Sequence, residues 1–244
     1  MIKLLNRVHP LSRGLKVCLT FQEYGGLLSN DAAYDNNALL STTGARLNAK
    51  GLDLDGTNPG TTGAQIPYGY SKYLSGNDFN TVYIRFKINS FTNTPILWSA
   101  SGASNDYFLR YDASGSTLYF GNNSFRTYTP SIVIGVNEWH SITVVKFGAG
   151  DVASLYIDGV LQTNYSGTVA SMTATTNPLY VGRYAFVNTI NLNGNVSHFY
   201  VYNRPMMLSE VRQLSSNPNA IFATSNISSL FIARNQNNFF RMFN

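Results

Sequence analysis

Residues 155–162 read LYIDGVLQ, in which Asp-Gly separates two short runs of alternating apolar side chains. A two-residue hairpin in a type I′ turn needs positive φ at both central positions, and Asp-Gly meets that need. Asp158 tolerates this backbone conformation, and Gly159 adopts it without a steric cost. The stretch therefore predicts a β-hairpin, with Tyr156 on the strand face opposite to its two apolar neighbours.

The composition favours a large all-β domain. Of the 244 residues, 12% are charged and 14% are aromatic, whereas about 25% charged residues is usual. The polar surface must then come from Asn, Ser, Thr and Tyr, as in extracellular and virion β domains. β-Sandwiches often run to this length as single domains, and no composition break divides the chain.

Charge and cysteine content argue against several functions. The net charge is +5, but the 17 Lys and Arg residues are scattered, so we expect no nucleic-acid partner. The single cysteine, Cys18, lies in an apolar run, which predicts a buried, inert thiol. The sequence has neither the apolar core of a signal peptide nor 18 consecutive apolar residues. We therefore expect a soluble chain with no membrane partner.

Alternating segments separated by turn signals recur along the chain. VYIRFKI (82–88) alternates most clearly, with Tyr83 and Arg85 on one face and large apolar residues on the other. EWHSITVVKF (138–147) is apolar on both faces, which predicts a strand between two layers. The other predicted strands are 15–21, 51–56, 95–100, 106–112, 116–122, 153–157, 160–164, 178–182, 195–203 and 230–233. Long loops are expected at 22–50, 57–81 and 183–193.

One short helix is expected near the end of the chain. The segment LSEVRQLSS (208–216) has Val211 and Leu214 three positions apart. Ser209 is its predicted N-cap, and the helix should end before Pro218.

Several of these segments occur in an order that resembles a known family. The series is GLDLDGTN (51–58), VYIRFKI (82–88), DYFLRYDASGSTLYFG (106–121), NEWHSITVV (137–145), LYIDGVLQ (155–162), YVGR (180–183) and GNVSHFYVYNRPMMLSEVRQL (194–214). It resembles the laminin-G-like, concanavalin A-like lectin/glucanase family. The family's closing motif is matched by Gly194, Val196, Tyr202, Asn203, Arg204, Leu208, Ser209 and Glu210, whereas Ser197 replaces its usual acid. The resemblance implies an all-β concanavalin A-like antiparallel β-sandwich (jelly roll) with one short helix near the C-terminus.

The flanking segments NRVHPLSRGLKVCLTF (6–21) and NPNAIFATSNISSLFIAR (217–234) are similar to sequences beside such domains in tailed-phage structural proteins. A virion protein assembles in the host cytoplasm and leaves by lysis, so it needs no signal peptide. We expect an N-terminal arm (1–14), a laminin-G-like sandwich (15–220), and a C-terminal strand with an aromatic tail (221–244).

The acidic residues do not form the pattern expected of a glucanase. Retaining hydrolysis needs two carboxyl groups about 5–5.5 Å apart, and glucanases of this shape carry Glu-x-Asp-x-Glu, or a near variant, on one strand. The glutamates Glu23, Glu138 and Glu210 are far apart in the sequence, and Asp53 and Asp55 have no third acid beside them. We therefore predict no catalytic residue and no enzyme activity.

Metal binding is also not expected. The three histidines are remote from one another and form no zinc signature. The resemblance leaves Ca²⁺ open as an alternative, because many relatives hold it on loop carboxylates and carbonyls. The candidate ligands would be Asp106, Asp112 and Asp151, but no acidic loop gathers them.

Aromatic side chains are the remaining candidates for a binding site. Strand alternation places seven residues opposite the core: Tyr83, Arg85, Tyr156, Tyr180, His198, Tyr200 and Tyr202. If their strands are neighbours, they form one surface on which sugar rings can stack. The alternative is that the long loops or a neighbouring subunit cover this face. Arg183 and Tyr184, with Asn122 and Asn123, form a second candidate on a loop rim, where plain turn chemistry is the alternative.

The chain ends in NNFFRMFN (237–244), which is unusually apolar for a free tail. Its predicted anchoring residues are Phe239, Phe240, Arg241, Met242 and Phe243. They either fold back onto the sandwich or dock on a partner. We expect a non-catalytic, homo-oligomeric virion structural protein, bound to capsid or tail proteins, that presents a lectin-like sandwich to glycans. A free carbohydrate-binding lectin and a β-glucanase-like hydrolase are the alternatives.

Overall fold

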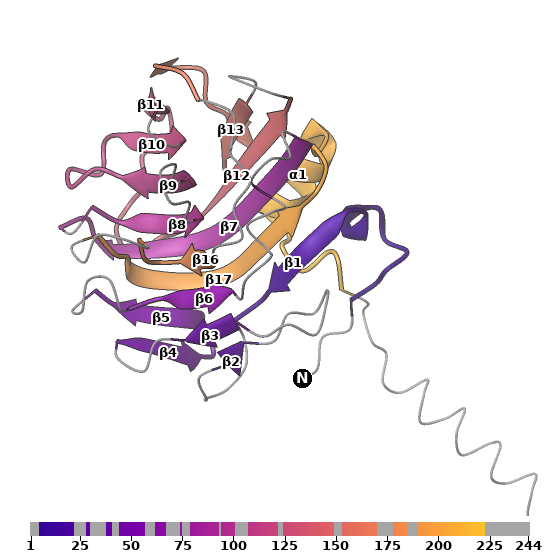
Figure 1. Cartoon of the computed structure of the whole chain (residues 1–244), viewed down its shortest axis with the longest axis horizontal. Coiled ribbons are helices and arrows are strands. Elements are labelled where there is room, and N and C mark those ends of the chain that lie inside the picture. The colour runs from indigo at the N-terminus through magenta and orange to yellow at the C-terminus, as the bar shows by residue number, and fades with distance from the viewer. Residues whose placement is uncertain are drawn as a thin grey trace, which may run out of the picture.

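The described part of the chain forms a sandwich of two antiparallel sheets (Figure 1). The computed structural model describes residues 5–21, 28–29, 38–40, 44–56, 62–66, 74, 79–92, 94–100, 107–121, 124–148, 153–169, 178–184 and 190–222. Within these ranges one sheet has eight strands and the other has nine. The predicted all-β antiparallel sandwich is therefore confirmed.

The eight-stranded sheet contains the longest strands. Its order is β14 (Val160–Leu161), β13 (Ala153–Ile157), β12 (Trp139–Phe147), β7 (Phe79–Ser90), β17 (Asn193–Tyr202), β5 (Gly51–Asp55) and β4 (Ala45–Asn48), and β1 (Leu15–Leu19) also pairs with β17. The nine-stranded sheet runs β15 (Tyr165–Ser166), β11 (Phe125–Tyr128), β10 (Leu118–Gly121), β9 (Tyr107–Tyr111), β8 (Ile96–Ala100), β16 (Leu179–Val181), β6 (Ala64–Ile66), β3 (Ala38–Leu40) and β2 (Leu28–Ser29). Two helices accompany the described strands, the 3₁₀-helix η1 (Pro10–Ser12) and α1 (Leu208–Ser216).

The main core lies between the two sheets and follows from strand alternation. Ile84 and Phe86 of β7 point into it, where they join Leu109 and Phe120 of the opposite sheet. Each such side chain contributes roughly 1.5–3 kcal/mol when it is fully buried. The alternation predicted for 82–88 is therefore the pattern that holds the sandwich together.

The Asp-Gly hairpin forms as predicted. Asp158 and Gly159 have φ values of 49° and 79°, as a type I′ turn requires. The Asp158 carboxylate also accepts a hydrogen bond from the Ser141 N–H at 2.7 Å, and its other oxygen lies 2.7 Å from Nδ1 of His140. The turn thus fastens the β13–β14 hairpin to strand β12.

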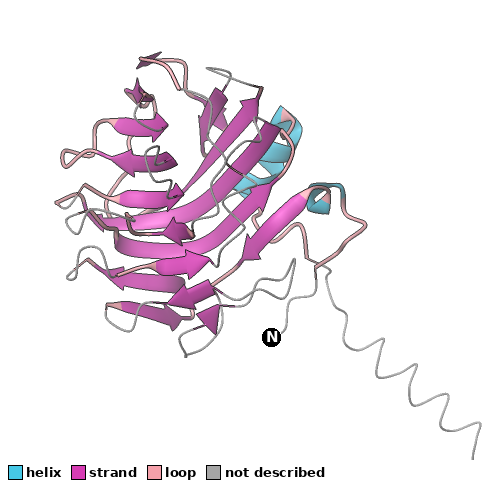
Figure 2. Ribbon diagram, viewed as in Figure 1, coloured by secondary structure: helices cyan, strands magenta, loops and turns pink. Residues whose placement is uncertain are grey.

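A second apolar cluster covers the outer face of the eight-stranded sheet. Helix α1 lies beside the long strands of this sheet (Figure 2) and packs Val211 and Leu214 against it. Val145 of β12 belongs to this second cluster, whereas Val144 belongs to the main core. Strand β12 therefore lies between two layers, which confirms the prediction from its two apolar faces.

The helix has the predicted range but not the predicted cap. Its N-cap is Met207 rather than Ser209. Glu210, in the third helical position, accepts the Met207 N–H at 2.9 Å. The prediction of Ser209 was wrong because a carboxylate one turn into the helix satisfies the N-terminal donor in place of a polar cap residue.

Several short strands were not predicted. Strands β2, β3, β4 and β6 lie in the segments expected to be long loops, and β11 and β15 were also missed. Strands of two to four residues carry too little alternation to be recognised without their neighbours.

The predicted strand 230–233 lies outside the described residues. No helix in the described ranges is long and apolar enough to span a membrane.

Candidate functional site

The structure divides the predicted glycan-binding residues between the two sheets. Tyr83, Arg85, Tyr156, His198, Tyr200 and Tyr202 belong to the eight-stranded sheet. Tyr180 belongs to β16 of the nine-stranded sheet, and Arg183 and Tyr184 follow that strand. The expectation of one continuous tyrosine face was wrong, because β16 pairs with β6 and β8 rather than with β7 or β17.

The tyrosines of the eight-stranded sheet are covered by the chain's own helix and the segment after it. Tyr83 and Tyr200 are both 0% exposed, and their rings stack with centroids 5.5 Å apart. The Tyr83 hydroxyl donates to the Leu214 carbonyl at 3.2 Å, and the Tyr200 hydroxyl donates to the Pro218 carbonyl at 2.9 Å. The open-face hypothesis was therefore wrong. The face is covered, but by helix α1 and the residues after it rather than by the long loops or a neighbouring subunit named in the alternative.

His198 is held in the same covered layer. Its Nε2 lies 3.1 Å from Oδ1 of Asn219, and its Nδ1 lies 2.9 Å from the Ser197 hydroxyl. The side chain is buried. His198 therefore has a structural hydrogen-bonding role and no surface to offer a ligand.

The other members of this set are also engaged. Tyr202 is fully buried and Tyr156 nearly so. Arg85 is half-buried, with its Cζ 5.2 Å from the centre of the Trp139 ring. Burial raises the pKa of Tyr202 well above its ordinary value, because a phenolate is disfavoured where water is excluded.

The outer face of the nine-stranded sheet carries a different group of aromatic residues. The register places six residues in one row across β6, β16, β8, β9, β10 and β11, namely Gln65, Tyr180, Ser99, Phe108, Gly121 and Phe125. Their sequence neighbours Leu179, Leu109 and Phe120 face the core, so alternation turns this row outward.

Aromatic and small residues alternate along this row. Ser99 and Gly121 each separate two aromatic positions, so the backbones of successive aromatic residues are about two strand spacings, roughly 9.5 Å, apart. The Phe108 and Phe125 rings nevertheless meet over Gly121, with centroids 6.1 Å apart. Gly121 has a φ of 139°, and an added Cβ would lie 2.8 Å from the Ser124 carbonyl oxygen. The backbone at this position therefore accepts no residue larger than glycine without a shift.

Two arginines lie against the rings of this face. The Cζ of Arg183 is 4.3 Å from the Tyr180 ring centre, and the Cζ of Arg110 is 4.9 Å from that of Tyr119. Such contacts hold a guanidinium over an aromatic face.

We call the aromatic residues of this face and their two arginines the aromatic row: Phe108, Arg110, Tyr119, Phe125, Tyr180, Arg183 and Tyr184. Edge-to-face contacts join Tyr184 to Phe108 at 6.0 Å and Tyr119 to Phe125 at 5.4 Å.

The aromatic row is only partly accessible. Tyr180 and Phe108 are 9% and 8% exposed, whereas Phe125 is 36% exposed. Tyr119 and Tyr184 are half-buried. The accessible surface therefore combines parts of the aromatic side chains with the half-buried arginines Arg110 and Arg183.

A buried polar group adjoins one end of the aromatic row. Asn191 forms an isolated antiparallel bridge with Arg183, so their side chains share a side. Asn191 is fully buried, and neither its Oδ1 nor its Nδ2 has a hydrogen-bond partner in the described part of the chain. Such an orphaned amide is costly unless water or a ligand satisfies it. Asn191 was not predicted, because it lies in a segment expected to be a loop.

The structure gives the calcium candidates little support as a group. Asp112 caps a turn, accepting hydrogen bonds from the Ser114 hydroxyl and the Ser116 and Thr117 N–H groups. Burial alone would raise the pKa of Asp112, but these hydrogen bonds outweigh it and lower the pKa. The described residues contain no group of three metal-ligating side chains. Asp106 and Asp151 lie outside the described residues, as do Asn122, Asn123 and the tail residues 239–243.

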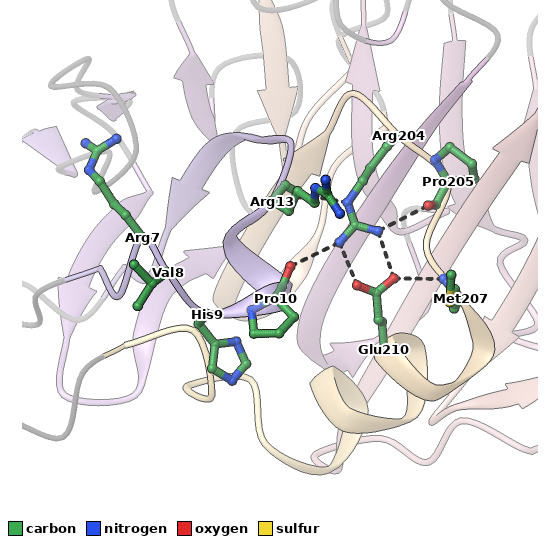
Figure 3. A pocket seen from close by; sticks show the side chains of 9 residues that line it. All are labelled: Arg7, Val8, His9, Pro10, Arg13, Arg204, Pro205, Met207 and Glu210. Carbon is green, nitrogen blue, oxygen red and sulfur yellow. Dashed lines mark hydrogen bonds and ion pairs between the residues drawn. The ribbon is translucent and has the colours of Figure 1, made fainter.

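A pocket of ≈ 650 Å³ opens on the other side of the sandwich (Figure 3). It is lined by Arg7, Val8, His9, Pro10, Arg13, Arg204, Pro205, Met207 and Glu210. These residues come from the segment before β1 and from the link between β17 and α1. An ion pair between Arg204 and Glu210, with two contacts of 2.7 Å, forms one wall.

Solved structures from three sources share this fold. A Trypanosoma rangeli sialidase in complex with sialic acid matches with a TM-score of 0.64 and 19% identity, over 85% of this chain and 33% of that chain. Domain 4 of a GH43 extracellular arabinanase from Geobacillus stearothermophilus, in complex with arabinotriose, matches with a TM-score of 0.50 and 16% identity, over 82% and 86% of the two chains. The binding domain of Paraclostridial Mosquitocidal Protein 1 gives 0.59 and 15%, over 83% and 52%.

These matches overturn the prediction that the chain is not an enzyme. The same fold occurs within sialidase chains and as a domain of an arabinanase. The lack of Glu-x-Asp-x-Glu excludes one arrangement of carboxylates, which was too narrow a ground for excluding glycosidases. The chain spans about a third of the length of the sialidases that it matches, and at this identity the likeness concerns the fold.

Sequence comparison agrees with the architecture. No curated protein sequence matched the chain. A family profile described as the concanavalin A-like lectin/glucanases superfamily matches residues 58–212, a range that runs from the segment before β6 into helix α1. With its two antiparallel sheets and a match over more than half of its length, the chain belongs to the concanavalin A-like lectin/glucanases superfamily.

Proposed function

We propose that the chain is a carbohydrate-binding domain that contacts its ligand through the aromatic row on the nine-stranded sheet. The observation that carries the proposal is the alternation of aromatic rings with Ser99 and Gly121 across adjacent strands. Aromatic rings offer rigid apolar surface to sugar rings, and the absence of a side chain at Gly121 lets the Phe108 and Phe125 rings come together into one such surface, with centroids 6.1 Å apart.

Polar groups beside the rings support the same proposal. Arg183 and Arg110 lie over Tyr180 and Tyr119, and the unpaired amide of Asn191 lies next to Arg183 in the backbone. A ligand site combines apolar surface with a few placed polar groups. Guanidinium and amide groups suit the hydroxyls and carboxylates of sugars. The arabinotriose complex of the similar arabinanase domain adds support from a neighbour in fold.

The proposal is tested by glycan-array screening of the purified chain, followed by calorimetry with any glycan that binds. Phe125→Ala removes an accessible ring of the aromatic row. Loss of one well-placed aromatic contact typically costs about 1–2 kcal/mol of binding free energy, so we expect affinity to fall roughly tenfold.

Phe147→Ala is the matched control, because Phe147 is 40% exposed and lies on the other sheet. Its affinity should equal that of the unchanged chain. No binding to any array glycan, or equal losses in the two variants, would count against the proposal. Release of reducing ends from the glycan in the same samples measures hydrolysis. The proposal concerns binding through the aromatic row and holds whether or not the glycan is cleaved.

We further propose that the domain is displayed on a virion surface. The support is the position of the two ends of the described chain. Leu5 bridges to Phe222, and the Asn6 N–H donates to the Ile221 carbonyl at 2.9 Å. Leu11 and Ile221 pack on the outer face of the eight-stranded sheet. Attachment through these segments would leave the aromatic row on the far side.

Display is tested by particle incorporation. Deleting residues 236–244 should remove the protein from purified particles if the aromatic tail anchors it, while glycan binding by the isolated chain stays unchanged. Unchanged occupancy of the particles would show that the tail is not the anchor.

A further inference from the structure

The pocket between the N-terminal segment and the helix carries an excess of positive charge. Three guanidinium groups line it, those of Arg7, Arg13 and Arg204, against the single carboxylate of Glu210. Among the described lining residues, arginines therefore outnumber carboxylates by two. The pocket volume of ≈ 650 Å³ is in the range of small-ligand sites, about 300–1,000 Å³.

The ion pair in the wall leaves little capacity for a ligand. Arg204 donates to both oxygens of Glu210 and to the Arg13, Pro205 and Pro10 carbonyls. These bonds use the five N–H donors of its guanidinium. Glu210 also accepts the Met207 N–H. Arg204 and Glu210 thus form a fixed frame and are not the groups that would meet a ligand.

Arg13 is the cation that the frame presents. Its carbonyl oxygen is fixed by Nε of Arg204 at 2.7 Å, whereas its guanidinium has no hydrogen bond to any described residue. Figure 3 shows the Arg13 side chain beside that of Arg204, with Arg7 across the pocket from Glu210. An anion at Arg13 would therefore make new charge-assisted hydrogen bonds without breaking existing ones.

The rim of the pocket indicates what else the ligand contains. Val8 and Met207 are 91% and 73% exposed, and Pro10 and Pro205 also line the pocket. The described residues of the lining include no Phe, Tyr or Trp, in contrast to the aromatic row. Aliphatic side chains next to a guanidinium suit a carboxylate with neighbouring apolar side chains, as in a peptide, better than they suit a sugar.

We propose that this pocket binds a carboxylate on a peptide segment of a partner protein. Arg13 pairs with the carboxylate, Arg7 adds to the attractive field, and Val8 and Met207 contact the apolar side chains beside it. The site lies on the opposite side of the sandwich from the aromatic row. It is therefore independent of the proposed carbohydrate binding.

The experiment uses the full ¹⁵N-labelled chain and two short peptides, acetyl-Leu-Glu-Leu-amide and acetyl-Leu-Gln-Leu-amide. The acidic peptide should shift the amide resonances of residues 7–13 and 204–210, and the neutral peptide should not. Arg13→Gln should weaken binding about fivefold, since a single exposed charge-assisted contact is lost. Raising the salt concentration to 0.5 M should weaken it as well.

Arg212→Gln is the matched control, because Arg212 is an exposed arginine of α1 outside the pocket. It should leave the affinity unchanged. The thermal midpoint of Arg13→Gln should equal that of the unchanged chain, because Arg204 binds the Arg13 backbone and not its side chain. Equal shifts with both peptides, no shifts in these segments, or tighter binding of glucuronic acid than of the acidic peptide would each overturn the proposal.

Discussion

Arg204 and Glu210 meet through two parallel hydrogen bonds, each 2.7 Å long, that join the end of β17 to the first turn of α1. The same guanidinium reaches the carbonyls of Arg13 and Pro10 in the N-terminal segment. One side chain thus links three parts of the chain that cover the eight-stranded sheet. This geometry gives a physical reason for the presence of Arg204 and Glu210 in the segment that resembles the family's closing motif.

Arg204→Gln should destabilise the fold by about 2 kcal/mol, because it breaks a half-buried ion pair and leaves carbonyls without donors. Urea unfolding monitored by tryptophan fluorescence measures the change. Arg212→Gln, an exposed substitution on the same helix, should stay within about 0.5 kcal/mol of the unchanged chain. Equal stability of the two variants would show that the ion pair contributes nothing.

Acid should weaken the same link. Burial alone would raise the pKa of Glu210, but hydrogen bonds from Arg204 and the Met207 N–H outweigh it and hold the pKa below its ordinary value. The unfolded chain then binds this proton more readily than the folded chain does. The stabilising contribution of the ionised Glu210 carboxylate is complete above the pKa of about 4.3 that the group has in the unfolded chain. It is lost as the pH falls through the lower pKa of the folded chain. Urea unfolding from pH 6 to pH 3 should show a smaller loss of stability in Glu210→Gln than in the unchanged chain.

Tyr83→Phe should cost about 1 kcal/mol of stability. The Leu214 carbonyl has no helical partner, because the residue four positions later is Pro218, which lacks an N–H. The Tyr83 hydroxyl takes that place at 3.2 Å. Denaturant unfolding checks the change, with Tyr165→Phe as the control, since Tyr165 is 44% exposed. An unchanged midpoint would mean that water satisfies the carbonyl.

The buried tyrosines should resist ionisation in the folded protein. Burial raises the pKa of Tyr83, Tyr111, Tyr200 and Tyr202 above the ordinary value of about 10. Stability is therefore complete below pH 10 and decreases as the pH rises above it, because only the unfolded chain loses these protons. As the pH is raised, the increase in absorbance at 295 nm should stay below the value for ionisation of all 16 tyrosines until the chain unfolds. A complete titration near pH 10 with the fold intact would contradict this.

Gly159→Ala tests the Asp-Gly hairpin that joins β13 to β14. The residue has a φ of 79°, and an added Cβ would meet its nearest neighbour at an ordinary 3.4 Å. The cost is therefore conformational, about 1–2 kcal/mol. Thermal unfolding measures it. A neutral result would mean that the turn relaxes to another type.

The long strands could be predicted because alternation continues for five residues or more. In β7 and β17 it determines which side chains enter the main core, and the Asp-Gly turn fixes the pairing of β13 with β14. The short strands β6 and β15 depend on the register of their neighbours, which a local pattern does not contain.

Four members of the aromatic row were not predicted, although three of them, Phe108, Arg110 and Tyr119, lay in predicted strands. Phe108 and Tyr119 alternate with core residues just as Tyr83 does, so each could be recognised as facing outward. What the sequence did not give was the order of strands across the sheet. Tyr180 was therefore grouped with Tyr83, whereas pairing places it in a row with Phe108. Asn191 carried no local signal, because its significance depends on its burial.

The bridge between Leu5 and Phe222 also bears on how such a domain can be combined with others. Because the polypeptide enters and leaves the sandwich at adjacent points, the whole unit can be spliced into a surface turn of a host protein without stretching either connection. The same proximity makes the sandwich suited to circular permutation, with new ends opened elsewhere on its surface.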